Sequence, residues 1–434
     1  MKVNSADKLY LSVSGAYLLL LLAVLFVFGY TPANDSDSYI EMARICIDEG
    51  QPYPCTALIK GQPFVWNIGS INIIALSLLL CGSTYPLLIV MCVLKASSAF
   101  LTAKITQTLF NEKTACAALA IFVVYPNNWG QSTTLLSEIP SIFLALLAVC
   151  LMLRGRKAYA FVAAGIVLCL SNWFRPIAIV FVVSLLIYFL LTDRRAVVRR
   201  FVPMIAGYCA AIMLLGTETY LRTGYFVYKG DTLWFNVCDD AYDGAEPGPH
   251  WNQETYEKGK PRYIENMDEL DCFQCAEIWR ERCLQWISRH KGEWLSKVPY
   301  RIVYMYYNDI DNMAFCLKDK SAAANNYVTL PYRNIATEIG SLSAPQWAAL
   351  VCTVCYWLIM LLFAAGVVLL AVRRQWKPLV LPLSVIVIGT LSLALVMHGE
   401  TRFKAPYMPY IMMIAAYSIA CIGNIRPTRR KDKA

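Results

Sequence analysis

The length of the uninterrupted apolar runs most constrains what this chain can fold into. Runs such as Leu9–Tyr30, Trp347–Val372 and Leu379–Met397 match the ~20 residues that a helix needs to cross a bilayer. A soluble helix would instead alternate apolar and polar faces. Only 16% of the residues are charged, against roughly a quarter in soluble domains. We therefore expect an all-α polytopic membrane protein.

The positive charges gather in short segments between the apolar runs. These segments hold Arg154, Arg156 and Lys157; Arg194, Arg195, Arg199 and Arg200; Arg373, Arg374 and Lys377; and a tail from Arg426 to Lys433. Short basic loops mark the cytoplasmic side of a membrane protein. The net charge of +9 is thus explained by topology, and we expect no nucleic-acid partner.

Placing those loops in the cytoplasm predicts about ten spanning helices and a cytoplasmic C-terminus. The expected spans are Leu9–Tyr30, Pro86–Leu109, Thr114–Tyr125, Ser137–Leu153, Ala158–Leu170, Phe174–Leu191, Phe201–Leu221, Trp347–Val372, Leu379–Met397 and Pro406–Gly423. One further run, Phe64–Leu80, would spoil the alternation and contains Trp66, Asn67 and Asn72. We predict that it is re-entrant or interfacial.

Several segments then face the non-cytoplasmic side. They are a first loop, Thr31–Gln62, carrying juxtamembrane helices; the links Asn127–Leu136, Asn172–Arg175 and His398–Lys404; and a long loop, Arg222–Gln346. The chain divides into an N-terminal membrane module (1–221), an outer loop domain (222–346) and C-terminal helices with a basic tail (347–434). Aromatic residues near Trp279 and Trp286 share one helical face, which fits either a headgroup helix or one packed under the loop domain.

Ionisable residues at membrane depth or in tight links are costly and are therefore candidates for function. They are Asp35, Asp37, Lys60, Lys95, Glu138, Arg175, Glu400, Arg402 and Lys404. All except Lys95 lie in outer links or at helix ends, whereas a transporter concentrates such groups near the midplane. Structural alternatives stay open: interfacial snorkelling for the cations, helix capping for Asp35 and Asp37, and a dipole contact for Glu138.

Five stretches carry a family resemblance. They are Asp35-Ser-Asp-Ser-Tyr-Ile-Glu-Met-Ala43, Lys60-Gly-Gln-Pro-Phe-Val-Trp66, Ser137-Glu-Ile-Pro-Ser-Ile-Phe143, Phe174-Arg-Pro176 and Glu400-Thr-Arg-Phe-Lys-Ala-Pro-Tyr-Met-Pro409. In order and sidedness they resemble the GT-C superfamily of membrane glycosyltransferases, nearest to protein O-mannosyltransferase-like and lipid A aminoarabinose transferase-like enzymes. The sequence departs from the pattern at Ser36, where an acidic residue is common, and in having one proline after Lys60. The loop 222–346 matches nothing in the pattern.

The resemblance implies transfer of a sugar from a polyprenyl-phosphate donor to a hydroxyl of a protein, lipid or glycan at the outer membrane face. It implies Asp35 as the base, with Asp37 in reserve, because a positioned carboxylate suits proton removal. Cations would hold the donor phosphate: Lys60, Lys95, Arg175, Arg402 and Lys404, with Glu400 beside them. Glu138 would orient the acceptor or hold a divalent cation, the only cofactor considered.

Two rival functions remain at this stage. A lipid flippase or transporter would need essential charges at mid-membrane, and an O-antigen ligase or polymerase would use a catalytic histidine such as His398. Among the outer cysteines, we predict a disulfide between Cys46 and Cys55, because Gly50, Pro52 and Pro54 let the chain turn back and the export side is oxidising. Two unpaired thiols are the alternative.

Overall fold

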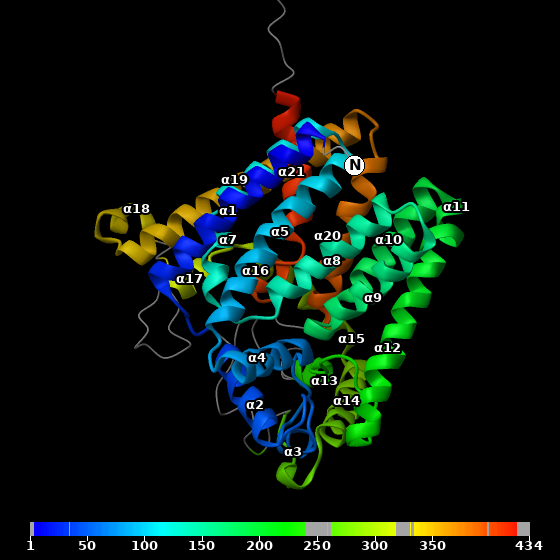
Figure 1. The fold of residues 1–434 in the computed structure, drawn as a ribbon. Helices are drawn as coiled ribbons and strands as arrows, with labels where there is room; N and C mark the ends of the chain where they lie inside the picture. Colours follow the sequence, from blue (N-terminus) through cyan, green and yellow to red (C-terminus); the bar gives the residue numbers. More distant parts are fainter. Residues whose placement is uncertain are drawn as a thin grey trace, which may run out of the picture.

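The protein is a bundle of helices. A computed structural model describes residues 4–33, 35–238, 258, 262–317, 330, 334–396 and 399–422. Every apolar run expected to span the membrane contains a helix of the bundle (Figure 1). These are α1 (Ser5–Phe28), α5 (Tyr85–Leu109), α6 (Glu112–Val124), α8 (Glu138–Arg154), α9 (Ala158–Phe174), α10 (Ala178–Thr192), α12 (Val202–Thr223), α19 (Ala344–Val372), α20 (Lys377–Val396) and α21 (Met408–Ile422).

Shorter helices lie between the long ones. They are α2 (Ser36–Asp48), α3 (Thr56–Gly61), α4 (Ile68–Cys81), α7 (Asn127–Gly130), η1 (Gln131–Thr133), α11 (Arg194–Ala196), η2 (Val197–Phe201), α13 (Leu233–Val237), η5 (Met267–Glu269), α14 (Cys272–Arg289), α15 (Lys291–Ser296), α16 (Val298–Tyr306), α17 (Asp311–Leu317), α18 (Ile335–Glu338), η6 (Ile339–Ser341) and η7 (Thr401–Lys404). An isolated β-bridge joins Val65 to Asp231.

Helix length and composition confirm an all-helical membrane protein. Five described helical segments are long and apolar enough to cross a membrane: α1, α5, Arg194–Thr223, α19 and α20. A sixth is added if the pair Asn127–Thr133 and Glu138–Arg154, bent by 116°, counts as one span. The remaining bundle helices are shorter, so the count of about ten spans stays a prediction.

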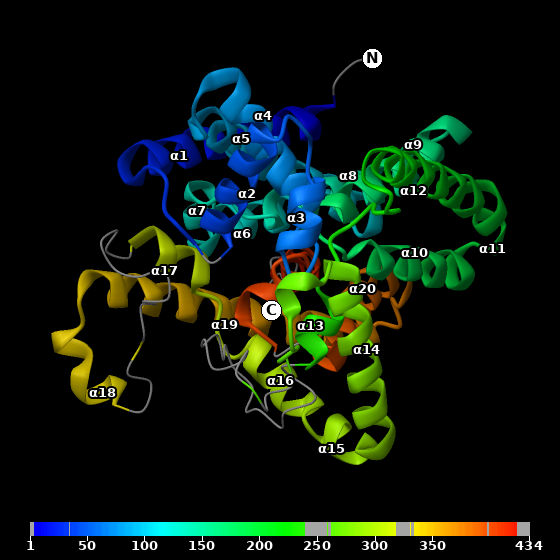
Figure 2. The same ribbon diagram turned by 90° about the horizontal axis from the view of Figure 1, so that it is seen from below.

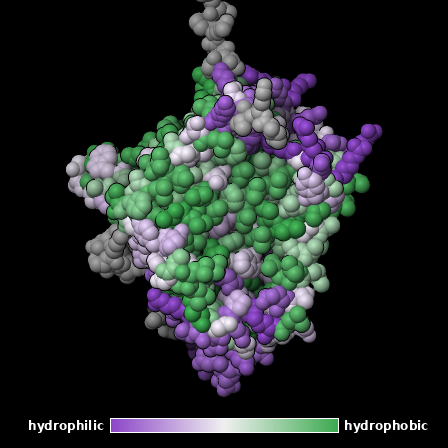
Figure 3. Space-filling model, viewed as in Figure 1, coloured by the Kyte–Doolittle hydropathy of each residue, from purple (hydrophilic) through white to green (hydrophobic). Residues whose placement is uncertain are grey.

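The hydropathy of the surface follows this architecture (Figure 3). A broad apolar band crosses the middle of the molecule, with hydrophilic surfaces above and below it. The N-terminal end of α1 lies at the upper end of the molecule in Figure 1, as does helix α11. Helices α2, α3, α13 and α14 lie at the lower end. Helix α4 lies across the bundle at that lower end, and its 14 residues span about 21 Å, less than a bilayer core.

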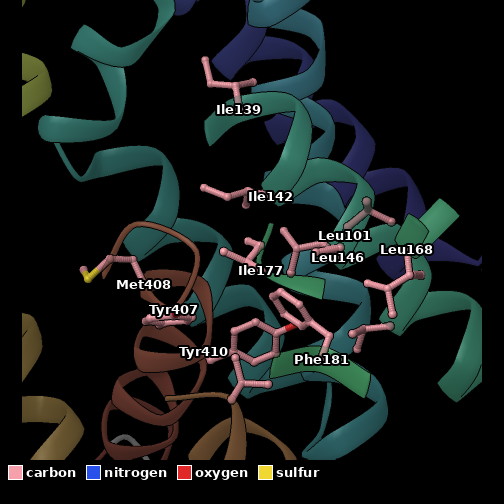
Figure 4. Packing of buried hydrophobic residues seen from close by; sticks show 14 of the residues in the cluster. Leu101, Ile139, Ile142, Leu146, Leu168, Ile177, Phe181, Tyr407, Met408 and Tyr410 are labelled. Atoms are coloured by element: carbon pink, nitrogen blue, oxygen red, sulfur yellow. The ribbon is translucent and has the colours of Figure 1, made fainter. Parts of the chain in front are cut away.

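The bundle core draws side chains from helices far apart in the sequence (Figure 4). Leu101 of α5, Leu146 of α8, Leu168 of α9 and Phe181 of α10 converge with Tyr410 of α21. The rings of Phe181 and Tyr410 lie 6.1 Å apart. This packing fixes the C-terminal helix α21 within the N-terminal module.

Small residues permit the closest helix approach. A Cβ added at Gly165 of α9 would lie 1.9 Å from the carbonyl oxygen of Met204, and one added at Gly207 of α12 would lie 2.2 Å from that of Val162. Membrane helices use small residues in this way to bring their backbones together. The α9–α12 contact therefore depends on both glycines.

One boundary differs from the expectation. The link predicted at Asn172–Arg175 falls instead at 175–177, because α9 continues to Phe174. Arg175 adopts an extended conformation (φ −154°, ψ 129°) ahead of Pro176. A proline disfavours helical geometry in the residue before it, so the helix ends at Phe174.

Helix α14 packs into a small hydrophobic core. Its buried residues Cys275, Trp279 and Cys283 form a small core with Phe64 and Phe235. Of the two arrangements left open for this face, the packed one is the one observed. Trp286 and Trp294 are only partly covered, and Trp294 packs against this core.

Candidate functional site

An ion pair between opposite ends of the chain lies at the centre of the candidate site. Asp35 is the N-cap residue of α2, and its Oδ2 lies 3.4 Å from Nη2 of Arg402 in η7. Arg402 also approaches Glu400 (Nε–Oε2 2.9 Å) and Glu138 (Nη1–Oε1 3.9 Å). One guanidinium group thus faces three carboxylates.

A second arginine completes the charge cluster. Glu138 is the first residue of α8, and its Oε1 lies 2.7 Å from Nη1 of Arg175, which follows α9. The side chain of Glu138 is only 3% exposed, and the guanidinium groups of Arg175 and Arg402 both face it. Both guanidinium groups lie over the ring of Phe403, at 5.6 and 5.7 Å. We name Asp35, Glu138, Arg175, Glu400 and Arg402 the charge cluster.

Hydrogen bonds of Asn67 and Ser137 hold the elements of the cluster together. The amide of Asn67, ahead of α4, donates to the hydroxyl of Tyr39 (2.8 Å) and to Ser137 Oγ (3.2 Å). Ser137 Oγ also accepts from Arg175 Nη1 (3.4 Å). Asn67 therefore links α2, which carries Asp35, to the start of α8, which carries Glu138.

Burial sets the protonation behaviour of Asp35. Desolvation raises the pKa of its carboxyl above the ordinary value, and the nearby charges of Glu138 and Glu400 raise it further, while Arg402 lowers it. The net result is a raised pKa. The side chain is 26% exposed, so the carboxylate stays reachable from outside. A reachable carboxylate with a raised pKa is a stronger base than an ordinary aspartate.

Asp37 and Lys60 lie apart from the charge cluster. Asp37 Oδ1 accepts a hydrogen bond from the hydroxyl of Tyr30 (2.9 Å). Lys60 is exposed near the end of α3, at the lower end of the molecule in Figure 1. The two-residue spacing turns Asp37 away from Asp35 on the first turn of α2, because positions i and i+2 of a helix do not share a face.

Lys95 is buried within the bundle. Its Nζ donates to Asn128 Oδ1 (2.8 Å) and Gln131 Oε1 (2.6 Å), and it lies 5.2 Å from the centre of the Phe122 ring. The described ion pairs of the charge cluster do not include it. The structure therefore joins Lys95 to α7 and η1 rather than to Asp35.

Lys404 lies on the same short helix as Arg402 but belongs to a second, fully buried network. Its Nζ lies 3.1 Å from Asp309 Oδ1 and donates to the carbonyl oxygens of Asn308 (2.5 Å) and Thr401 (2.7 Å). Asp309 also accepts from the hydroxyl of Tyr125 (2.5 Å). The side chain of Lys404 has no exposed surface. In this structure Lys404 joins η7 to Asn308 and Asp309, which lie just before α17.

Asp311 extends this network toward the charge cluster. Thr401 Oγ1 donates to Asp311 Oδ2 (2.5 Å). Burial raises the pKa of Asp311 to about 6, partly offset by Lys404 and by the Thr401 hydrogen bond. The sequence did not indicate Asp309 and Asp311 as site residues, because they lie in the loop that matches no motif. Nothing in the local sequence Asp309-Ile310-Asp311 indicates that Asp309 pairs with a buried lysine.

The carboxylates of the cluster do not form a metal site among the described residues. No group of three or more His, Cys, Asp or Glu side chains in that part of the chain is arranged to hold a metal ion. Oxygens of Asp35, Glu138 and Glu400 face guanidinium groups instead. His398, considered as a catalytic histidine, lies outside the described residues.

The cysteines predicted to pair lie close together. Cys46 Sγ and Cys55 Sγ are 3.9 Å apart and both side chains are buried. This separation exceeds the ~2.05 Å of a disulfide bond. The bond itself therefore stays a prediction, which the proximity supports.

Comparison with known proteins identifies the fold. No family model matches the sequence, and a search of characterised proteins gave no match. The structure is similar to the Archaeoglobus fulgidus oligosaccharyltransferase in its apo form (TM-score 0.53, 11% identity), covering 95% of this chain and 50% of that one. It is also similar to that enzyme tethered to an acceptor peptide containing the NVT sequon (0.53, 14%; 95% and 49%).

A third similar structure contains a lipid. It is the archaeal oligosaccharyltransferase AglB from A. fulgidus in complex with an inhibitory peptide and a dolichol-phosphate (TM-score 0.51, 12% identity; 95% and 50% coverage). The chain thus spans about half the length of the structures it matches. These neighbours are GT-C membrane glycosyltransferases, so the fold expected from the five motif stretches is confirmed.

Proposed function

We propose that this chain is a glycosyltransferase that moves a sugar from a polyprenyl-phosphate donor to an acceptor hydroxyl on the non-cytoplasmic face. The observation that carries the proposal is the pairing of Asp35 with Arg402, reinforced by Glu138 and Arg175. It combines a partly exposed carboxylate of raised pKa with two arginines on a GT-C fold.

In this reaction Asp35 is the general base. The acceptor oxygen attacks the anomeric carbon as its proton passes to the Asp35 carboxylate. The bond from the anomeric carbon to the phosphate oxygen breaks, and polyprenyl phosphate leaves with the electron pair. A single displacement of this kind inverts the anomeric configuration. Positioned general bases typically contribute 10²–10⁴ in rate.

Arg402 and Arg175 stabilise the departing phosphate. Charge grows on the phosphate oxygens as the bond breaks, and preorganised cations at that place favour the transition state. A guanidinium group suits this task because its planar fork binds two phosphate oxygens at once. The complex of AglB with a dolichol-phosphate supports a polyprenyl phosphate as the lipid part of the donor.

Glu138 positions both arginines. It lies 2.7 Å from Arg175 and 3.9 Å from Arg402, so it orients the two guanidinium groups and offers an oxygen to the acceptor. We assign acceptor choice to residues 222–346, the part of the chain with no counterpart among the motifs. The peptide acceptor of the archaeal enzyme makes a protein acceptor one of three classes to test, beside lipid and glycan.

The function is tested by mass spectrometry of glycolipids and glycoproteins from host cells with and without this chain. We expect one glycan or glycolipid species to lose a sugar while its unmodified precursor accumulates. Unchanged glycoconjugates combined with a lipid-linked sugar trapped on the inner leaflet would instead indicate a flippase. A missing oligosaccharide block, rather than a single sugar, would indicate a ligase or polymerase.

A further inference from the structure

Two buried thiols meet in the core of the outer loop domain. Cys238 follows α13 and Cys283 lies on α14, and their sulfur atoms are 3.2 Å apart. Both side chains are inaccessible to solvent. The residues are 45 positions apart in the sequence, so the contact reflects the tertiary fold and not a local turn.

The surroundings of this pair are apolar and aromatic. Phe235, one turn before Cys238, lies 5.3 Å from the Trp279 ring, one turn before Cys283. Trp279 Nε1 donates to the carbonyl oxygen of Arg262 (3.2 Å), whose guanidinium stacks on Phe235 at 3.6 Å. Helices α13 and α14 lie side by side in the view from below (Figure 2). The two thiols therefore lie in a packed core, with little freedom to separate.

A chain of ring contacts leads from this core to the charge cluster. Phe235 packs on Phe64 (4.5 Å), Phe64 on Trp66 (4.8 Å), and Trp66 on Tyr39 (5.8 Å). Tyr39 lies on α2, one turn after Asp35, and accepts the hydrogen bond from Asn67. The position of α13 thus helps to set the position of α2.

We propose that Cys238 and Cys283 form a structural disulfide that locks α13 onto α14. The oxidant is a disulfide-bearing thiol oxidoreductase of the export compartment. Exchange breaks one S–S bond in the oxidant and forms one between Cys238 and Cys283, and the two thiol protons end on the oxidant's sulfurs. Because both sulfurs are buried, the bond forms during folding, before the core closes.

The proposal is independent of the transferase reaction, because its readout requires no catalysis. It depends on this domain facing an oxidising compartment, where disulfides persist. Cys275 provides a matched control, since it lies in the same core on α14, two turns before Cys283. Its replacement removes a buried thiol but leaves the proposed bond intact.

The test is differential alkylation of the full-length protein. Membranes are denatured in alkylating reagent without reductant, digested and mapped by mass spectrometry. We expect peptides carrying Cys238 and Cys283 joined, about 2 Da lighter than the two reduced peptides together, and separated by reductant. The proposal would be overturned if both thiols were alkylated without reductant, or if either cysteine were joined to a different cysteine.

A stability measurement supplies the second readout. Every sample has Cys46 and Cys55 replaced by serine. In this background we expect reductant to lower the melting temperature of the parent protein and of Cys275→Ser, because the cross-link restricts the unfolded chain. The Cys238→Ser/Cys283→Ser variant should melt lower from the start. Reductant should not shift the melting temperature of that variant further. An equal reductant shift with and without Cys238 and Cys283 would contradict the lock.

Discussion

Asp35 Oδ2 and Arg402 Nη2 lie 3.4 Å apart although the two residues are separated by 367 positions in the sequence. Asp35 stands at the start of α2, after the first long helix, and Arg402 stands in η7, before the last one. The bundle therefore has to close fully before this carboxylate and this guanidinium group meet. Several consequences of this pairing can be measured.

Replacing Arg402 with alanine should weaken the hold on the donor phosphate. Hydrogen bonds to charged groups contribute about 1.5–3 kcal/mol, so kcat/KM for the lipid-linked donor should fall roughly 10- to 100-fold. Arg402→Lys should recover only part of the loss, because a point charge cannot reproduce the bidentate fork. Initial rates of the purified variants against donor concentration provide the measurement. Full recovery by lysine would contradict a bidentate contact.

The rate of transfer should depend on pH through Asp35. Only the deprotonated carboxylate accepts the acceptor proton, so activity is lost as pH falls through its raised pKa, above the usual ~3.9. The charge of Glu138 helps to raise that pKa, whereas Arg402 lowers it. The acidic limb of the rate profile should therefore move to lower pH in Glu138→Gln and to higher pH in Arg402→Gln. Shifts in the same direction would contradict this assignment.

Lys404→Met should destabilise the protein. The substitution leaves the buried Asp309 carboxylate without its cation, and breaking a buried pair in this way typically costs ~3–5 kcal/mol. The double variant with Asp309→Asn should recover part of the loss. Arg280→Ala serves as the control, because its pair with Glu277 is about half exposed and exposed pairs contribute about 0–1 kcal/mol. Melting temperatures in detergent compare the four proteins. An unchanged Lys404→Met protein would remove the anchoring role.

Helix α4 should not cross the bilayer. Its 14 residues reach about 21 Å, and it lies across the lower end of the bundle. Cysteine labels introduced near Gln62 and near Ser83, in a background where Cys81 is serine, should react with an impermeant reagent from the same, outer side. Labelling from opposite sides would place Asp35 and Glu138 in different compartments and would contradict the site.

Much of the helical architecture follows from local patterns. Apolar runs of sufficient length predict the bundle helices because backbone groups in lipid have no other hydrogen-bond partners. The motif stretches also indicate the candidate site residues. Of these, the structure brings together Asp35, Glu138, Arg175, Glu400 and Arg402. Their roles remain predictions. Apolar content predicts that α9 ends at Leu170, but the polar residues Ser171 and Asn172 have hydrogen-bond partners inside the bundle, so the helix continues to Phe174.

Contacts between distant segments could not be predicted in the same way. Lys404 resembles a site cation in sequence, yet its partner Asp309 comes from a loop without a recognisable motif. Lys95 finds amide partners on the bent link before α8, and Asp37 finds Tyr30. Each of these outcomes depends on which surfaces meet in the folded bundle. A periodic pattern describes one element at a time and carries no such information.

Asp35→Asn tests the central claim most directly. The variant keeps the size of the side chain but cannot accept the proton, so turnover should fall by ~10²–10⁴ while folding and donor binding survive. Asp37→Asn is the matched control, because Asp37 is held by Tyr30 apart from the charge cluster and its loss should cost much less. The measurement is the transferred product formed by cells that lack the native chain and carry each variant at equal membrane abundance. We predict product from the wild type and Asp37→Asn but almost none from Asp35→Asn. Near-normal product from Asp35→Asn would contradict the account.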